Sequence, residues 1–134
     1  MKIDFSQAIT AETRAADLVK SQKATVAAAR YNKETVGIKV DGISINTERD
    51  SQAMITGAAL SAVLDSSYIC RWKTPSGFVD LDSTSLIKVS QSMRQYIQAC
   101  FDRESELVEA IVNGTYTDSM LNEGWPNVEI SNNT

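Results

Sequence analysis

Hydrophobic and polar residues follow a helical period in three stretches of the chain and alternate in short runs between them. The first helical stretch begins at Thr10, an acceptable N-cap, has Glu12 in its first turn, and continues through alanine-rich sequence to about Asn32. Residues 1–9 show no sustained period, and we expect them to form a flexible lead-in. The pattern therefore predicts a long N-terminal helix that starts at Thr10.

A narrow stripe of mostly small residues lies along one side of this helix. Its members recur at steps of three and four residues: Ala15, Leu18, Val19, Gln22, Val26 and Ala29. The stripe buries little apolar area alone and suits close approach to another helix. Two interpretations stay open: the helix folds back on its own domain as a third layer, or it binds a second copy or a groove in another protein. In the second case Gln22 would set the register, and the six residues form the candidate partner-binding site.

The first alternating run predicts a β-hairpin whose turn is Asp41-Gly42. This dipeptide between two β-branched runs is typical of a type I′ turn, because both central residues need a positive φ. In that register Lys39 and Ser44 point to one face. The opposite face collects Val36, Ile38, Val40, Ile43, Ile45 and Thr47. The hydrophobic pattern and the turn chemistry thus predict the same hairpin.

A second hairpin is predicted from residues 68–73 and 78–81, joined by a turn at 74–77. Proline early in that turn and glycine late in it fit the backbone angles of a short β-turn. Alternation divides the first run between two faces. One face holds Tyr68, Cys70 and Trp72, and the other holds Ile69, Arg71 and Lys73.

A helix is predicted after the first hairpin. Thr47 is its expected N-cap, Asp50 supplies an acid in its first turn, and the helix runs to about Leu64 or Asp65. Its expected core-facing residues are Met54, Ile55, Ala58, Ala62 and either Leu64 or Val63. The small side chains among them allow this helix to approach a sheet closely.

A longer helix is predicted after the second hairpin. Asp82 and Ser83 cap it, and it ends at about Asn113, where Gly114 supplies a left-handed stop. A broad apolar stripe along it indicates that one face is buried. The polar sequence that follows has three bulky anchors, Met120, Leu121 and Trp125. We expect the end of the chain, residues 130–134, to be loose.

The order of these elements predicts an α+β fold. A long N-terminal helix precedes a tandem ββα-ββα domain with two hairpins, two helices and a small, mainly antiparallel sheet. We divide the chain into three parts. Residues 1–33 are the lead-in and the oligomerisation or docking helix, residues 34–114 are the ββαββα domain, and residues 115–134 are a polar C-terminal tail.

The composition of the chain argues against several classes of partner and cofactor. In 134 residues, 13 basic and 17 acidic side chains give a net charge of -4, so we expect no nucleic-acid partner. No stretch approaches the roughly 20 apolar residues that span a bilayer, and the N-terminus lacks the apolar run of a signal peptide. We therefore expect a soluble protein made in the cytosol, with no membrane partner. Because the chain has no histidine and Cys70 and Cys100 stand in no zinc-binding spacing, we expect two reduced thiols, no metal and no cofactor.

Few residues support an enzymatic function. Histidine, the usual base beside a serine or cysteine nucleophile, is absent. Carboxylates that could serve a glycosidase occur in two groups: Asp80 with Asp82, and Asp102, Glu104 and Glu106 with Glu109. We interpret Asp82 as a helix cap and the second group as a solvated helix face. An enzyme that cleaves cell-wall glycan stays an alternative function. It would require the carboxylates of the second group to converge in a cleft.

Two short motifs have simpler structural interpretations. Arg71-Trp72-Lys73 places an aromatic residue between two bases, as in some proteins that bind single-stranded nucleic acid. At this net charge we interpret Trp72 as a core residue flanked by solvated charges. Asn113-Gly114-Thr115 matches a glycosylation acceptor, and we interpret it as a helix end.

Several motifs from about Ala28 onward resemble a known family. They are residues 28–31 (AARY), 37–43 (GIKVDGI), 47–52 (TERDSQ), 72–81 (WKTPSGFVDL) and 98–111 (QACFDRESELVEAI). Together they cover roughly residues 28–112. They resemble an uncharacterised domain of tailed bacteriophages, often encoded in or beside tail-fibre and tail-fibre-assembly genes. The shared positions are mainly turn and core residues, and no catalytic residue is carried over from the family.

This resemblance implies a non-enzymatic phage tail protein that acts by protein-protein binding and oligomerisation. Its expected partners are other tail proteins, above all a tail fibre, and further copies of itself, in the virion tail. The alternative is a transient tail-fibre assembly chaperone, present in the host cytoplasm and absent from the mature virion. Residues 1–27 are too short for the separate partner-binding domain of many assembly proteins. That shortness favours a virion or accessory protein whose N-terminal helix makes the contact.

Overall fold

The computed structural model describes residues 6–132 of the chain. Its elements are α1 (Ser6–Thr35), β1 (Ile38–Val40), β2 (Ile43–Ile45), α2 (Arg49–Leu64), β3 (Ile69–Thr74), β4 (Gly77–Asp82), α3 (Ser83–Asn113), the 3-10 helix η1 (Asp118–Asn122) and β5 (Glu129–Ile130). A long N-terminal helix precedes two hairpin-helix units, so the predicted α+β class is confirmed.

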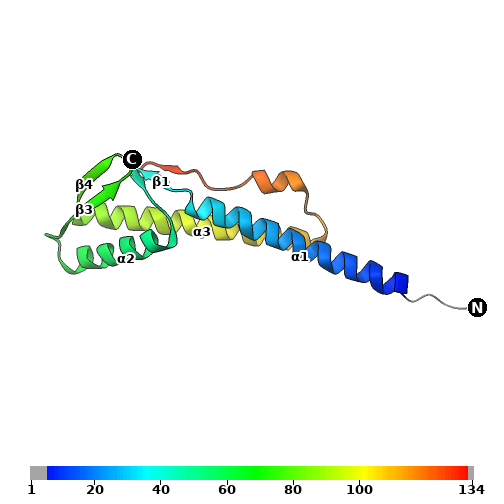
Figure 1. Cartoon of the computed structure of the whole chain (residues 1–134). Coiled ribbons are helices and arrows are strands. Elements are labelled where there is room, and N and C mark those ends of the chain that lie inside the picture. The colour runs from blue at the N-terminus through cyan, green and yellow to red at the C-terminus, as the bar shows by residue number, and fades with distance from the viewer. Residues whose placement is uncertain (1–5, 133–134) are drawn as a thin grey trace, which may run out of the picture.

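The longest helix, α3, runs the length of the packed part of the molecule (Figure 1). The α1 helix lies antiparallel to α3 along its C-terminal half, while α2 and the two hairpins pack around its N-terminal half. The main core cluster lies between α3, α2 and the first hairpin: Ile38, Val40, Ile45, Ile55, Val89, Met93, Tyr96, Ile97 and Cys100. The broad apolar stripe predicted for α3 is therefore its buried face.

The two hairpins form as predicted but belong to two separate sheets rather than one. One sheet has the order β2-β1-β5, and the other contains β3 and β4 alone. The β1-β2 and β3-β4 pairs are antiparallel, whereas β5 lies parallel to β1. The strands of the first sheet are short, since β1 and β2 have three residues each, whereas β3 and β4 have six.

The first hairpin has the predicted turn. Asp41 and Gly42 both adopt positive φ, at 50° and 83°, and Val40 pairs with Ile43 on either side of them. The expectation for Val36 is wrong, because its side chain is 65% exposed. Strand β1 begins only at Ile38, after a change of direction at Gly37, so Val36 lies outside the alternating strand.

The second hairpin and the long helix after it also match the prediction. Thr74 pairs with Gly77 across the turn, and Trp72 is partly buried while Lys73 and its alternating neighbours are exposed. The Asp82 side chain accepts a hydrogen bond from the backbone N–H of Ser85 at 2.8 Å, as an N-cap does. At the other end, Gly114 has a left-handed φ of 75°.

Two predicted helix starts are wrong. The α1 helix begins at Ser6 rather than Thr10, because no helix breaker stands between them. The lead-in expected at residues 1–9 is thus helical from Ser6, and residues 1–5 lie outside the described part. The α2 helix begins at Arg49, with Glu48 as the N-cap residue. Thr47 is instead fully buried, and its Oγ1 accepts a hydrogen bond from the backbone N–H of Gly37 at 3.0 Å.

The buried face of α2 differs in part from the prediction. Ile55 and Ala62 are buried as expected, together with Gln52, which the hydrophobic pattern did not select. The side chains of Met54, Val63 and Leu64 are exposed by 64%, 67% and 79%, so their assignment to the core is wrong. The α2 helix is apolar on several sides, and its sequence therefore could not show which side meets α3.

The C-terminal segment is part of the fold, which corrects the expectation of a loose end at residues 130–132. The backbone carbonyl of Ile130 accepts a hydrogen bond from Asp41 N–H at 2.9 Å, and Asn132 N–H donates to the Asp41 carboxylate at 2.7 Å. Upstream, Arg103 of α3 donates to the carbonyls of Met120 and Glu123. These bonds tie the returning chain to both ends of the packed region.

Candidate protein-binding site

The α1 helix has a packed C-terminal part and an N-terminal part that projects from the molecule. Every side chain from Thr10 to Leu18 is exposed, and Val19 is the first that is partly buried. Figure 1 shows this part of the helix continuing past the end of α3. We call residues 6–18 the projecting end of α1; at 1.5 Å per residue it is about 20 Å long.

The six candidate residues divide between these two parts. Ala15 and Leu18 lie on the projecting end, where the Leu18 side chain is 58% exposed. Val19, Gln22 and Ala29 are partly buried, and Val26 is fully buried. The structure therefore folds the C-terminal part of the stripe onto its own chain. Ala15 and Leu18 are the members that stay accessible to another protein.

A satellite core holds the packed part of α1 in place. Val26 contacts Leu107 and Ile111 of α3, and Val19 lies at the edge of the same cluster. The returning C-terminal segment completes the cluster with Tyr116, Met120, Leu121 and Trp125. All three anchors predicted for the tail thus pack here, and the tail covers the seam between α1 and α3.

A buried carboxylate fixes the C-terminal end of α1. Glu34 is 1% exposed, and its oxygens accept hydrogen bonds from Arg30 at 2.6 Å, Arg49 at 2.6 Å and Gln52 at 2.9 Å. Burial opposes ionisation of Glu34, but these three donors outweigh it and lower the pKa of the carboxyl. Because Arg49 and Gln52 belong to α2, one side chain joins two helices.

Arg30 extends this network to the third helix. Its Nε donates to the Glu104 carboxylate at 3.1 Å, and its guanidinium lies 4.4 Å from the centre of the Phe101 ring. The spacing of Arg30 and Glu34 by four residues was the one sequence signal for the network. The remaining partners come from distant positions and could not be paired from the sequence. The network sets the direction in which the projecting end points.

The two cysteines lie in different surroundings. Cys100 is buried beside Tyr96, and burial raises the pKa of both groups. The Tyr96 hydroxyl donates to the backbone carbonyl of Lys33 and so adds another link between α3 and α1. Cys70 is partly buried on β3. A thiol with a raised pKa is a poor nucleophile at neutral pH, so Cys100 acts as a core residue.

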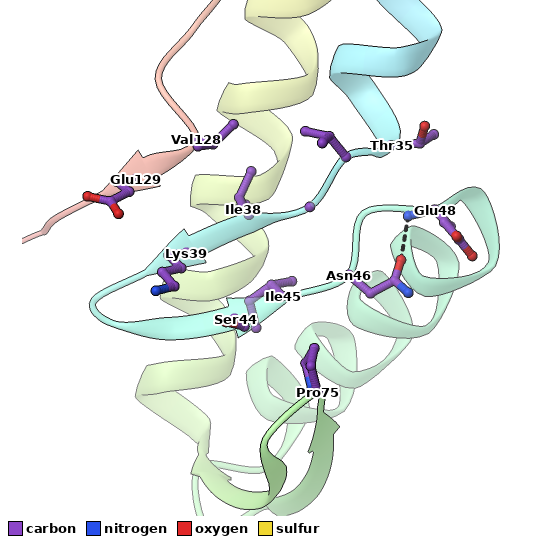
Figure 2. A pocket seen from close by; sticks show the side chains of 12 residues that line it. Thr35, Ile38, Lys39, Ser44, Ile45, Asn46, Glu48, Pro75, Val128 and Glu129 are labelled. Atoms are coloured by element: carbon purple, nitrogen blue, oxygen red, sulfur yellow. Dashed lines mark hydrogen bonds between the residues drawn. The ribbon is translucent and has the colours of Figure 1, made fainter.

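A hollow of about 410 Å³ lies over the first hairpin (Figure 2). Lys39 of β1, Glu129 of β5 and Glu48 at the start of α2 contribute its charged side chains, and Val36 and Pro75 lie among its apolar ones. Lys39 and Glu129 are paired across neighbouring strands, so opposite charges stand side by side. None of the residues singled out for partner binding lines this hollow.

The candidate carboxylates of α3 do not meet in a cleft. Asp102 accepts a hydrogen bond from Gln98 at 2.9 Å, Glu104 from Arg30, and Glu106 from Arg103 at 3.0 Å. Within residues 6–132, no group of three or more acidic or cysteine side chains is placed to hold a metal ion. The same part of the chain has no helix long and apolar enough to cross a bilayer.

Trp72 lies where the sequence placed it. Its side chain packs against two core clusters, while Arg71 on the opposite face of β3 forms an exposed ion pair with Asp80 at 3.2 Å. The aromatic residue is therefore turned away from the neighbouring bases.

The sequence model of one protein family matches residues 7–123, from the first turn of α1 to the end of η1. Its description is Domain of unknown function (DUF4376). The chain belongs to this family. The DUF4376 region includes the projecting end of α1, the network around Glu34 and both hairpins, and strand β5 lies beyond it. No curated protein matches the chain, and no solved structure matches it.

Proposed function

We propose that this DUF4376 protein is a non-enzymatic component of a bacteriophage tail, a connector or fibre component associated with the tail fibre. It works by binding other protein chains, including copies of itself. Ala15 and Leu18 on the projecting end of α1 make the contact. The phage context comes from the sequence motifs, and the mode of action comes from the arrangement of α1.

The observation that carries the proposal is the exposure of α1 from Thr10 to Leu18. Short helices are marginal in water on their own, and most helical stability comes from packing of an apolar face. From Thr10 to Leu18 no side chain is buried, although this stretch is continuous with a firmly held helix. Binding to another chain would bury Leu18, which is 58% exposed.

The firm attachment of α1 supports the same function. Glu34 and Arg30 link the base of α1 to α2 and α3, and the tail covers the seam farther along. A helix held in one direction presents its end to a partner with little loss of conformational entropy on binding. This suits a connector that must keep two larger parts in a fixed relation.

Site-specific photo-cross-linking tests the proposal. A photoreactive amino acid replaces Ala15, and the matched control carries it at Lys88, an exposed position on α3. Both variants are produced in host cells during growth of the phage. We expect the variant at Ala15 to form an adduct with a phage tail protein or a second copy, and the Lys88 variant to form none. Folded protein that gives no such adduct from Ala15 would refute the proposal.

The alternative is a transient tail-fibre assembly chaperone that uses the same projecting end. Mass spectrometry of purified virions separates the two roles. A virion component is present at a fixed ratio to the tail proteins in the purified particle. A chaperone is found in the infected cell and is missing from the particle.

A further inference from the structure

The outer face of α2 is apolar and uncovered. From Ser51 to Leu64 the helix contains no charged residue. One side packs on α3 through Ile55 and Ala62, while the opposite side leaves Leu60 60% and Leu64 79% exposed. Apart from a few uncharged polar residues this stretch is apolar, and a helix with large apolar residues on opposite sides usually packs on both sides. The composition of α2 therefore indicates a second packing partner.

Gly57, which lies on this outer face, also indicates a second packing partner for α2. Glycine in the middle of a helix is less favourable than alanine, so it usually has a packing reason there. Within the described chain no such reason exists, because a Cβ atom built at Gly57 would meet nothing within 4 Å. The missing side chain leaves a notch in the surface that no residue between 6 and 132 fills.

The residues on the outer face complement a second copy of themselves. Ala53, Gly57, Leu60 and Leu64 follow one another at steps of four, three and four, so they form one line along the helix. In an antiparallel pair with its two-fold axis between residues 58 and 59, Gly57 lies opposite Leu60 and Ala53 lies opposite Leu64. Each large side chain then meets a small one, and each contact occurs twice, as a two-fold interface requires.

We propose that the outer face of α2 binds a second copy of this chain in an antiparallel, two-fold pair. The absence of charge means that two identical faces do not repel each other. Met54 and Val63, 64% and 67% exposed, flank the central line and add apolar area on either side of it. This inference rests on α2 alone and does not depend on the role proposed for α1.

The proposed interface consists of one helix from each copy. The length of this helix limits the buried area and therefore the affinity of the pair. The α2 helix has 16 residues and is about 24 Å long, so the area buried falls at or below the lower end for specific interfaces. We therefore expect a weak pair, with a dissociation constant of about 1 to 50 μM. Sedimentation velocity over a range of concentrations measures such an equilibrium directly.

The substitution Gly57→Leu distinguishes specific packing of the two helices from nonspecific hydrophobic association. The substitution adds exposed apolar surface and favours the helix, so it keeps the fold and would strengthen a nonspecific association. In the proposed pair it fills the notch that receives Leu60, and we expect the dimer to weaken at least tenfold. Leu60→Asp should do the same by burying a charge. Ile69→Asp, at a 65% exposed residue of β3, is the matched control and should leave the dimer unchanged.

Mixing two variants tests the antiparallel register. Gly57→Lys and Leu60→Asp each weaken the pair alone, but a mixture places one lysine opposite one aspartate and should restore association. A wild-type protein that sediments as a monomer at about 0.5 mM, far above the expected dissociation constant, would overturn the proposal. So would a Gly57→Leu variant that dimerises as well as the wild type, or a mixture that associates no better than its parts. Leu18→Asp changes the projecting end alone and should leave this dimer intact, which separates the two proposed contacts.

Discussion

At the residue scale, the buried Glu34 side chain links α1 to α2. Its carboxylate receives donors from its own helix and from α2, and Arg30 passes the connection on to Glu104. A buried charge is tolerated only when its bonding capacity is filled, and here three donors fill it. Removing the charge deprives the largely buried Arg30 and Gln52 of their charged acceptor, whereas the Arg49 side chain is 58% exposed and can bind water.

We predict that Glu34→Gln lowers the free energy of unfolding at neutral pH by about 3 kcal/mol. The sign of the acid dependence follows from the lowered pKa of Glu34. The stabilisation is complete above the ordinary carboxyl value of 4.5 and is lost as the pH falls below it toward the folded-state pKa. Urea unfolding at a series of pH values measures both effects. A variant with wild-type stability at neutral pH would contradict the account of this network.

Thr47 shows how far a local sequence pattern can predict the role of a side chain. Its position before an apolar run made it a reasonable N-cap, and the helix does begin close by. The side chain is instead buried and binds Gly37 N–H, because the first hairpin packs its end against α2. A cap and a buried tertiary contact look alike in sequence. The tertiary partner decides between them.

At the element scale, α1 is one helix with a packed part and an exposed part. The sequence showed the stripe of six residues on α1. It also raised two interpretations: that the helix folds back on its own domain, or that it binds another protein. The answer depends on where α3 ends, since α1 is packed only alongside α3 and the returning tail. Folding back is observed for Val26, which is fully buried, and outward binding remains the proposal for Leu18, which is 58% exposed. Helix lengths alone could not divide the stripe between them.

We predict opposite outcomes for one substitution in the two parts of α1. Val26→Asp places a charge at a fully buried site and should lower the free energy of unfolding by about 3 kcal/mol or more. Leu18→Asp alters an exposed site and should leave the melting temperature within about 2 °C of the wild type. Thermal unfolding followed by circular dichroism makes the comparison. Equal melting temperatures for the two variants would show that the packed part of α1 is misassigned.

The C-terminal tail was predicted as a polar extension, and its three bulky anchors were identified correctly as contact points. Strand β5 was missed because two residues give no detectable alternation, and its pairing with β1 crosses most of the chain. A parallel strand added from a distant segment leaves almost no local signal. Turn chemistry and helical periods, which are local, explain why both hairpins and α3 were predicted well.

We predict that truncation after Gly114 destabilises the whole fold. It removes Trp125, Leu121 and the other tail residues that cover the α1-α3 seam, together with the strand that pairs with β1. The melting temperature should fall by more than about 5 °C. Hydrogen exchange should accelerate in α1 around Val26 more than in α2. Unchanged exchange in α1 would mean that the tail does not support this helix.

At the scale of the whole molecule, the two proposed contacts lie at opposite ends of an elongated body (Figure 1). The projecting end of α1 extends from one end, and α2 lies at the other beside the hairpins. Between them, α3 runs continuously for 31 residues and is joined to α1 by side-chain bonds and apolar contacts. A rigid body with a contact at each end suits a connecting part of a larger assembly.

The measurement that tests this account most directly is the yield of infectious particles from a phage that lacks its own copy of the gene. The host supplies the wild-type chain, Leu18→Asp or Phe78→Asp, a control at a 65% exposed residue of β4. We expect Leu18→Asp to lower the yield at least tenfold while its thermal unfolding stays like that of the wild type, and Phe78→Asp to support normal yield. Normal particle yield with Leu18→Asp would contradict the claim that the protein works through the projecting end of α1.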